Sequence, residues 1–238
     1  MKYTEKMKVR WHDTDAYRYV RPSEILVYMQ ETANRQLDNA GLSLDNLRDT
    51  KKLAFILSKI KLVFHKQLFA YDEIDARTWT CDSRGYTFNR CFDIHKNGEL
   101  VAEAISFWAL IDLNEKKLVR SDNFSLGVEN DKLLDISVPR RIKPPEEEPT
   151  LLGTRNIRYS DIDYNMHMNN TRYPNMLCDF MPIDKIPKIR EMTLEFLHES
   201  AFGDTLTFYG TTKDGRYYFK TVNESQDTCL VAEVITED

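Results

Sequence analysis

The chain has 238 residues, which allows one large domain or two smaller ones. Hydrophobic residues make up 42 % of the sequence, enough for a packed core, so a wholly disordered chain is excluded. The formal net charge of −5 argues against a nucleic-acid-binding protein, because such proteins depend on a broad basic face.

Neither a membrane span nor a targeting signal is predicted. The longest apolar runs are far shorter than a bilayer requires. Residues 1–6 contain neither the apolar stretch of a signal peptide nor a leader rich in serine and arginine. We therefore expect a cytoplasmic protein.

The cysteines predict neither a disulfide framework nor a metal site. They form no CxxC pair, and their spacing fits no zinc template. We expect reduced thiols packed as small hydrophobic side chains, and we expect no metal and no cofactor. The four are Cys81, Cys91, Cys178 and Cys229.

The first half of the chain is predicted to contain a strand, a long helix and four further strands. Pro22 suits the first turn of a helix, and Gly41 is a natural stop. Apolar residues between them recur at helical spacing, which predicts a helix over residues 22–40. Because this helix has a broad apolar face to bury, we expect antiparallel strands to wrap around it. The strands are predicted at residues 3–11, 53–68, 73–82, 86–96 and 100–113.

A change of composition separates this half from the next. Residues 139–149 are rich in proline and charge, which is typical of a linker rather than of a core. We therefore expect an N-terminal domain over residues 1–120, a linker over 121–150 and a C-terminal domain over 151–238. In the last of these, a shorter helix is predicted at residues 170–180, and Pro174 must lie in its first turn. Strands are predicted at residues 152–159, 189–199, 204–212, 216–224 and 228–236.

The two halves repeat one unit. Residues 10–15 match residues 158–163, and residues 100–103 match residues 230–233. The halves differ at chemically important positions. The second half has Asn165, His167 and Glu199 where the first has Tyr17, Tyr19 and Gln67. Only the second half therefore has a set of titratable groups, and the first half is free to form a pocket.

Residues 161–170 contain the strongest functional signal. Asp163, Asn165 and His167 fall at alternate positions, so an extended segment would place them on one face. Four apolar residues would take the other face: Ile162, Tyr164, Met166 and Met168.

These polar residues suit the addition of water to a carbonyl. Asp163, His167 and Glu199 are candidates for acid–base work, and the amide of Asn165 could donate to a developing oxyanion. The helix that starts near Asn170 presents free N–H groups at its positive end.

Other interpretations stay open. Asp163 could close a turn, and His167 could be a structural donor. Asn169 and Asn170 suit helix caps better than catalysis. A Cys178–His167 nucleophile pair and a metal site of His167, Asp163 and Glu199 are weaker alternatives. His198 is expected to be structural, whereas His12, His65 and His95 show no pattern that suggests a partner and are expected on the surface.

The sequence resembles the acyl-acyl-carrier-protein (acyl-ACP) thioesterases, which terminate fatty-acid chains in plant plastids and some bacteria. The motif Asp163-x-Asn165-x-His167-x-Asn169-Asn170-x-x-Tyr173 is similar to the active-site motif of that family. Residues 30–33, 78–79 and 106–108 match it as well, so the resemblance covers nearly the whole chain. It implies an α+β fold, the double (tandem) hotdog, in which an antiparallel sheet wraps a central helix in each half.

The resemblance also implies a catalytic set of Asp163, Asn165, His167 and Glu199. At the position where family members carry a cysteine once proposed as the nucleophile, this chain has Ser200. A thiolate mechanism is then excluded there, and a carboxylate that activates water remains. The absent leader departs from plant members and suggests a bacterial protein.

We therefore expect hydrolysis of fatty acyl-ACP, with the acyl carrier protein as partner. Leu26, Met29 and Ala33 are expected to bind the acyl tail, and Asn169 and Asn170 are also expected to contact the substrate. Residues 140–143 and 185–190 contain basic clusters that could dock the acidic carrier. An acyl-CoA thioesterase, a hotdog hydratase or dehydratase, and an inactive acyl-binding module remain alternatives. The acyl chain length and the formation of a homodimer are left open.

Overall fold

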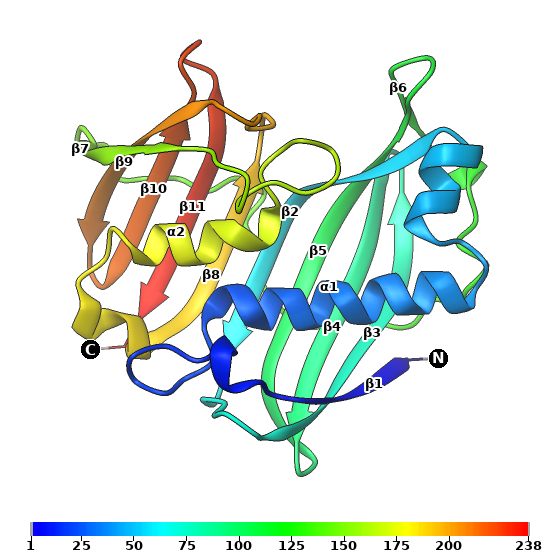
Figure 1. Cartoon of the computed structure of the whole chain (residues 1–238), viewed down its shortest axis with the longest axis horizontal. Coiled ribbons are helices and arrows are strands. Elements are labelled where there is room, and N and C mark those ends of the chain that lie inside the picture. Colours follow the sequence, from blue (N-terminus) through cyan, green and yellow to red (C-terminus); the bar gives the residue numbers. More distant parts are fainter. Residues whose placement is uncertain (1, 238) are drawn as a thin grey trace. The chain divides into compact units, whose positions relative to one another are not determined.

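The computed structural model describes residues 2–237 and divides into two compact units. The N-terminal unit ends at Ser137, and the C-terminal unit begins at Val138. Each unit contains one antiparallel sheet with one helix lying across a face of it (Figure 1). The domain limits expected from the sequence stay a prediction.

The N-terminal sheet has the strand order β1-β3-β4-β5-β2, and the short strand β6 pairs with β5. All of these pairings are antiparallel. The repeated hairpins follow from the turn residues between the predicted strands, and β6 is the one strand that the sequence did not predict. The strands are β1 (Tyr3–Lys8), β2 (Leu53–Phe64), β3 (Glu73–Arg84), β4 (Thr87–Lys96), β5 (Glu99–Asp112) and β6 (Lys117–Val119).

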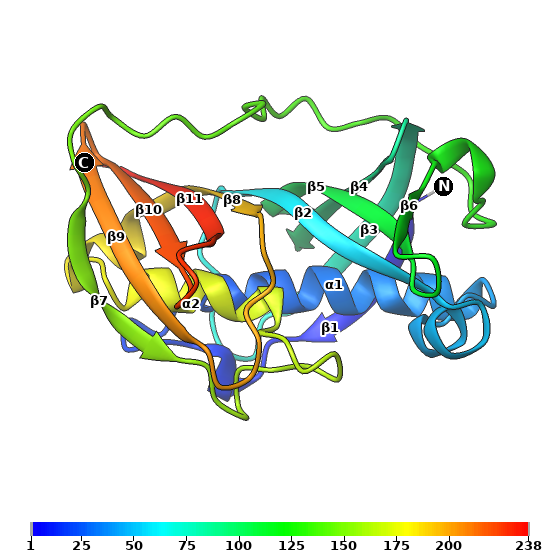
Figure 2. The same cartoon turned by 90° about the horizontal axis from the view of Figure 1, so that it is seen from above.

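Helix α1 (Pro22–Asn39) fills the concave face of this sheet. Pro22 lies in its first turn, where the missing N–H is not needed. Leu26, Met29 and Ala33 lie on the buried side of α1 and are 0 %, 1 % and 6 % exposed. Figure 2 shows the sheet curving around the helix, as the sequence predicted. Short helical turns lie at Trp11–Asp13, Asn46–Thr50 and Ser121–Asn123.

The C-terminal unit repeats this plan with a shorter helix. Its sheet has the order β8-β11-β10-β9-β7 and wraps α2 (Tyr173–Cys178), which follows the 3₁₀ turn η4 (Asn170–Arg172). Pro174 lies in the first turn of α2, the place where proline is tolerated. A second 3₁₀ segment lies at Ile183–Lys188. The strands are β7 (Thr150–Asn156), β8 (Ile189–Phe196), β9 (Thr205–Lys213), β10 (Arg216–Val222) and β11 (Thr228–Thr236).

The segment before α2 folds into a tight turn, so the prediction of an extended segment there is wrong. The N–H of Asp163 donates to the carbonyl of His167 over 3.0 Å, and the N–H of Met166 donates to the carbonyl of Asp163 over 3.0 Å. The Asp163 carboxylate also accepts the N–H of Asn165 at 2.8 Å. Met166 has a φ of +63°, a left-handed conformation that the alternation of side chains could not predict.

The corresponding loop of the N-terminal unit forms the same turn. The N–H of Asp15 donates to the carbonyl of Tyr19 over 2.8 Å, and the Asp15 carboxylate accepts the N–H of Tyr17 at 2.8 Å. Arg18 has a φ of +68°, matching Met166. The internal repeat therefore extends to individual hydrogen bonds, although the side chains of the two turns differ.

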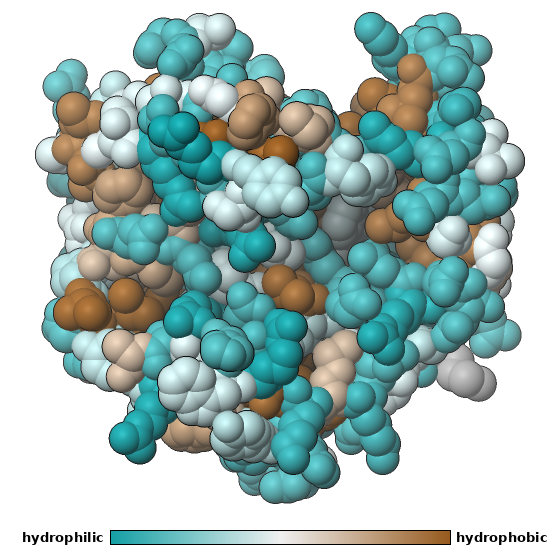
Figure 3. Space-filling model, in the orientation of Figure 1, coloured by the Kyte–Doolittle hydropathy of each residue, from teal (hydrophilic) through white to brown (hydrophobic). Residues whose placement is uncertain are grey.

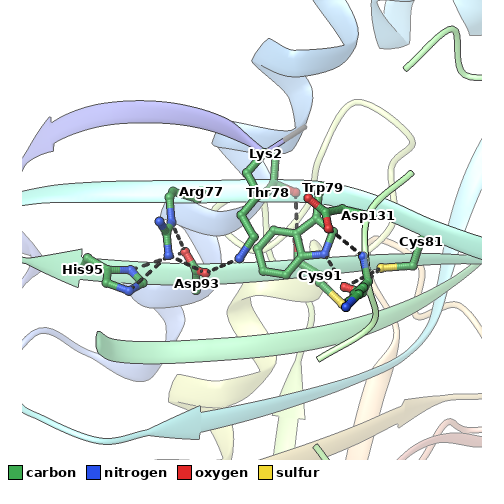
Figure 4. A network of polar contacts seen from close by, with 10 residues as sticks. Lys2, Arg77, Thr78, Trp79, Cys81, Cys91, Asp93, His95 and Asp131 are labelled. Carbon is green, nitrogen blue, oxygen red and sulfur yellow. Dashed lines mark hydrogen bonds and ion pairs between the residues drawn. The ribbon is translucent and has the colours of Figure 1, made fainter. Parts of the chain in front are cut away.

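A polar network covers part of the outer face of β3 and β4 (Figure 4). Asp93 accepts hydrogen bonds from Arg77 and Lys2, and Arg77 also lies 3.1 Å from Nε2 of His95. The side chain of His95 is only 18 % exposed, and its burial lowers the pKa of the imidazole. The expectation that His95 lies on the surface without a partner is therefore wrong.

The chain that follows β6 is anchored to β3. The indole N–H of Trp79 donates to the carbonyl of Lys132 over 2.7 Å, and the N–H of Asp131 donates to the carbonyl of Thr80 over 2.8 Å. Thr80 and Asn130 form a parallel bridge. This part of the predicted linker thus belongs to the N-terminal unit, because its backbone pairs with the sheet.

All four cysteines are buried and free, which agrees with their expected role as small packed side chains. No helix within residues 2–237 is long and apolar enough to cross a membrane. Figure 3 shows a mainly hydrophilic face on which the hydrophobic residues form separate small groups. The cytoplasmic location stays a prediction.

The matching turns predict that Asp15 and Asp163 stabilise their turns to the same extent. The substitutions Asp15→Ala and Asp163→Ala should each lower the free energy of unfolding by about 1–2 kcal/mol, because N–H groups of the turn lose a charged acceptor. Urea denaturation followed by circular dichroism measures the change.

Asp38→Ala serves as a control, since Asp38 is an exposed residue of α1. That variant should differ from the parent by less than about 0.5 kcal/mol. Full stability of Asp163→Ala would show that its carboxylate does not hold the turn.

Candidate active site

The turn at Asp163–His167 is held against the chain that follows β8. His167 and Ala201 form an antiparallel bridge. The N–H of Met168 donates to the carbonyl of Ser200 over 2.8 Å, and the N–H of Phe202 donates to the carbonyl of Met166 over 2.9 Å. These backbone bonds bring Glu199, the residue just before Ser200, beside His167.

The two side chains meet. Nδ1 of His167 lies 3.2 Å from Oε2 of Glu199, within hydrogen-bonding distance. The side chains are 35 % and 59 % exposed, so water reaches both. Within residues 2–237, no protein group bonds Nε2 of His167, which leaves that nitrogen open to a ligand.

The N-terminal unit has the same backbone arrangement without this pair. There, Tyr19 forms the antiparallel bridge, with Phe69 as its partner. The residues that correspond to His167 and Glu199 are Tyr19 and Gln67, and neither can act as a base near neutral pH. The difference between the halves therefore lies in the side chains and not in the framework.

Asp163 and Asn165 join this pair through the turn. Asp163 binds the N–H of Asn165 with its carboxylate and the carbonyl of His167 with its own N–H. Both side chains are half-buried. The structure thus brings together the four residues that the sequence singled out. Asp163 fixes the backbone of Asn165 and of His167.

The serine after Glu199 is turned away from solvent. Ser200 is 1 % exposed, and its hydroxyl lies 2.8 Å from the hydroxyl of Tyr173 on α2. Burial raises the pKa of Tyr173, so this phenol stays neutral. The pair is therefore a structural contact, and the sequence did not predict it. Cys178, the alternative nucleophile, is buried at the end of α2.

The asparagines that follow the turn cap the next helical segment. Oδ1 of Asn169 accepts the N–H of Thr171 at 2.9 Å and its hydroxyl at 2.8 Å, and Asn170 begins η4. The cap interpretation is confirmed for Asn169. The role of either residue in substrate binding stays a prediction.

The other histidines lie outside this constellation. His198 is exposed, and its Nδ1 lies 2.8 Å from the carbonyl of Thr228, in agreement with a structural role. His65 pairs with Glu103 at 3.0 Å, although the sequence suggested no partner for it. Across residues 2–237, no group of three histidine, cysteine or acidic side chains is placed to hold a metal ion.

The geometry suits general acid–base chemistry on a neutral electrophile. A carboxylate next to an imidazole can take a proton from water, and the exposure of Glu199 lets a water molecule approach. The amide of Asn165 is the nearby donor that could face a carbonyl oxygen.

Comparison with known proteins identifies the family to which the chain is related. Residues 1–123 match the family model of the acyl-ACP thioesterase N-terminal domain, and residues 146–237 match that of the C-terminal domain. The structure is similar to an acyl-ACP thioesterase from Bacteroides thetaiotaomicron, with a TM-score of 0.89 and 22 % identity over 99 % of this chain and 98 % of that chain. It is also similar to the 12:0-ACP thioesterase from Umbellularia californica, with a TM-score of 0.84 and 16 % identity over 99 % and 97 % of the two chains.

Among curated sequences, the chain is 23 % identical over 213 residues to the chloroplastic palmitoyl-acyl carrier protein thioesterase of Arabidopsis thaliana. The match covers 83 % of this chain and 52 % of that protein, so the chain spans about half the length of such relatives. The structural similarities establish the double hotdog fold, as the sequence predicted. The two domain matches cover most of the sequence, and the chain belongs to the acyl-ACP thioesterase family.

Proposed function

We propose that the protein hydrolyses the thioester between a fatty acyl chain and the acyl carrier protein. The observation that supports this most strongly is the His167–Glu199 pair, present in the C-terminal half and replaced by Tyr19 and Gln67 in the other. Membership of the acyl-ACP thioesterase family supports the choice of substrate. The products are a free fatty acid and the thiol of the carrier.

In this proposal Glu199 is the general base. Its carboxylate takes a proton from water as the water oxygen bonds to the thioester carbon, and the carbonyl electrons move to oxygen. Asn165 donates to this oxyanion, and His167 holds Glu199 and polarises the carbonyl. Asp163 fixes the turn that carries both. When the carbonyl re-forms, the carbon–sulfur bond breaks and the thiolate takes up the proton.

The two proposed acid–base residues give the first test of function. Glu199→Gln keeps the shape of the side chain and removes the base, so kcat on acyl-ACP should fall by about 100-fold or more. His167→Ala should cause a loss of similar size, because Glu199 loses its partner. Release of free thiol from purified protein measures both rates.

The N-terminal half supplies matched controls. Gln67→Ala and Tyr19→Ala change the equivalent positions and should leave kcat nearly unchanged. Near-parental rates for both Glu199→Gln and His167→Ala would refute the assignment.

A parent protein that consumes the double bond of an enoyl thioester without releasing thiol would instead be a hydratase. Thiol release from acyl-CoA alone would make it an acyl-CoA thioesterase.

We further propose that the acyl tail binds along the buried side of α1, at Leu26, Met29 and Ala33. Gln36 lies one turn beyond Ala33 on the same buried side, and its Oε1 accepts a hydrogen bond from Arg90 at 2.6 Å. Burial lowers the pKa of Arg90 to about 10, which leaves the guanidinium charged at neutral pH. A charged group at this point would oppose the entry of further methylene groups, because the charge cannot be desolvated cheaply.

The position of the tail predicts a change in product length. Ala33→Leu fills space on the buried side of α1, so the preferred acyl chain should become shorter by two or more carbons, since each methylene needs room of its own. Gas chromatography of the released acids measures the profile, and a thermal melt checks that the variant folds.

Ala40→Leu is the control, because Ala40 follows α1 and is exposed. Its product profile should equal that of the parent. A folded Ala33→Leu variant with the parental profile would place the tail elsewhere.

The dock for the carrier also remains a proposal. Arg140, Arg141 and Lys143 are exposed, in keeping with a role in binding an acidic partner. Arg190 of the second cluster forms an ion pair with Glu237, which satisfies part of its charge.

A further inference from the structure

Two arginines flank the candidate active-site turn in sequence, and neither side chain has a protein partner among residues 2–237. Arg158 precedes the turn, and Arg172 is the last residue of η4. Both are exposed, and neither guanidinium forms an ion pair or hydrogen bond with any group in residues 2–237. Asp161, the carboxylate nearest in sequence, is instead bound by Arg155 at 2.6 Å.

The N-terminal half shows where these arginines stand in the framework. The N–H of Asp13 donates to the carbonyl of Arg10 over 3.1 Å, just as the N–H of Asp161 donates to the carbonyl of Arg158 over 2.9 Å. Each aspartate also accepts the N–H of its arginine in return. Arg158 is therefore the structural counterpart of Arg10.

The counterpart of Arg172 follows from the start of the helices. The N–H of Glu24 donates to the carbonyl of Arg21 over 2.9 Å, and the N–H of Arg172 donates to the carbonyl of Asn169 over 2.9 Å. Arg172 thus takes the place that Glu24 has in the N-terminal half.

In the N-terminal half these two places form an ion pair. Arg10 binds Asp13 at 2.9 Å and lies 3.7 Å from Glu24, so its charge is balanced. In the C-terminal half, both places carry a positive charge, and Asp161 is already bound to Arg155. These two positions therefore carry opposite charges in the N-terminal half, which lacks the His–Glu pair. They carry like charges in the C-terminal half, which has it.

Two guanidinium groups at positions close enough for an ion pair repel one another unless an anion lies between them. Planar guanidinium forks bind phosphate oxygens in pairs, and two such groups at neighbouring places in the framework suit a single compact anion. An acidic protein surface, in contrast, carries carboxylates that are spread out, and its binding would need basic groups spread over a similar area.

We propose that Arg158 and Arg172 bind the phosphodiester at the root of the phosphopantetheine arm, which carries the acyl thioester. This inference rests on the proposed function, because it assumes a substrate with that arm. It identifies the two arginines as binding residues that act on the affinity for the substrate and not on the chemical step.

The test compares two thioesters that differ only in the phosphate. Replacing both arginines (Arg158→Ala together with Arg172→Ala) should raise KM for acyl-phosphopantetheine by about tenfold or more, since hydrogen bonds between charged groups are lost. KM for acyl-pantetheine, which has no phosphate, should not change, and kcat should stay near the parental value with both.

Lys220→Ala is the control for the loss of a positive charge, because Lys220 is exposed on β10. It should leave both KM values unchanged. A second variant, Arg172→Glu, restores the charge pattern of the N-terminal half. It should fold as well as the parent and show the same selective rise in KM.

Calorimetric titration with 4′-phosphopantetheine separates this inference from the hydrolase proposal. The parent should bind this thiol more tightly than it binds pantetheine, and the double variant should bind the two equally, whether or not the protein turns over any thioester. Equal binding by the parent would overturn the inference. A rise in KM confined to acyl-ACP, without one for acyl-phosphopantetheine, would also overturn it and would point to acidic side chains of the carrier.

Discussion

The closure of residues 161–169 against residues 199–204 is the constraint on which the site depends. Backbone hydrogen bonds close the turn at Asp163, with one further bond to the Asp163 carboxylate, and the bridge between His167 and Ala201 is made by backbone groups. Because the backbone carries the framework, the side chains of His167 and Glu199 are free to serve chemistry. A water-exposed ion pair alone contributes little stability, so the framework positions the pair and not the reverse.

The internal repeat shows which residues serve the framework and which differ between the halves. Asp15 and Asp163 organise identical turns, yet only one turn carries a histidine. Positions that keep the same hydrogen bonds in both halves serve the fold. Positions that differ are where the chemistry of the two halves can differ, and His167, Glu199 and Arg172 all belong to this second group. The internal copy therefore acts as a reference structure within one chain.

Much of the fold could be predicted from the sequence, because its signals are local. The apolar spacing of α1, Pro22 at its start and the turn residues between strands each report on a few neighbouring residues. The internal repeat then predicted that both halves share one plan. The short strand β6 has too few residues for a pattern, and the contact of Lys132 with Trp79 joins residues that are distant in sequence.

The sequence identified the residues that the structure brings together, but it did not predict their geometry. Asp163, Asn165 and His167 alternate as a strand would, but the left-handed Met166 bends them into a turn, and only backbone hydrogen bonds decide between the two. The burial of Ser200 on Tyr173 depends on where α2 lies. Arg172 did leave a signal, since the repeat aligns it with Glu24, but the importance of that exchange appears only when the partner of Glu24 is known.

The anchoring of residues 129–132 on β3 has a consequence for association. β1 pairs with β3 only as far as Thr78, so the rim of the sheet beyond it would expose unpaired peptide groups. Asn130 and Asp131 occupy that rim at Thr80. An open rim is a template on which a foreign strand can dock and begin aggregation. The chain thus shields this stretch of its own sheet with the segment that leads toward the second unit.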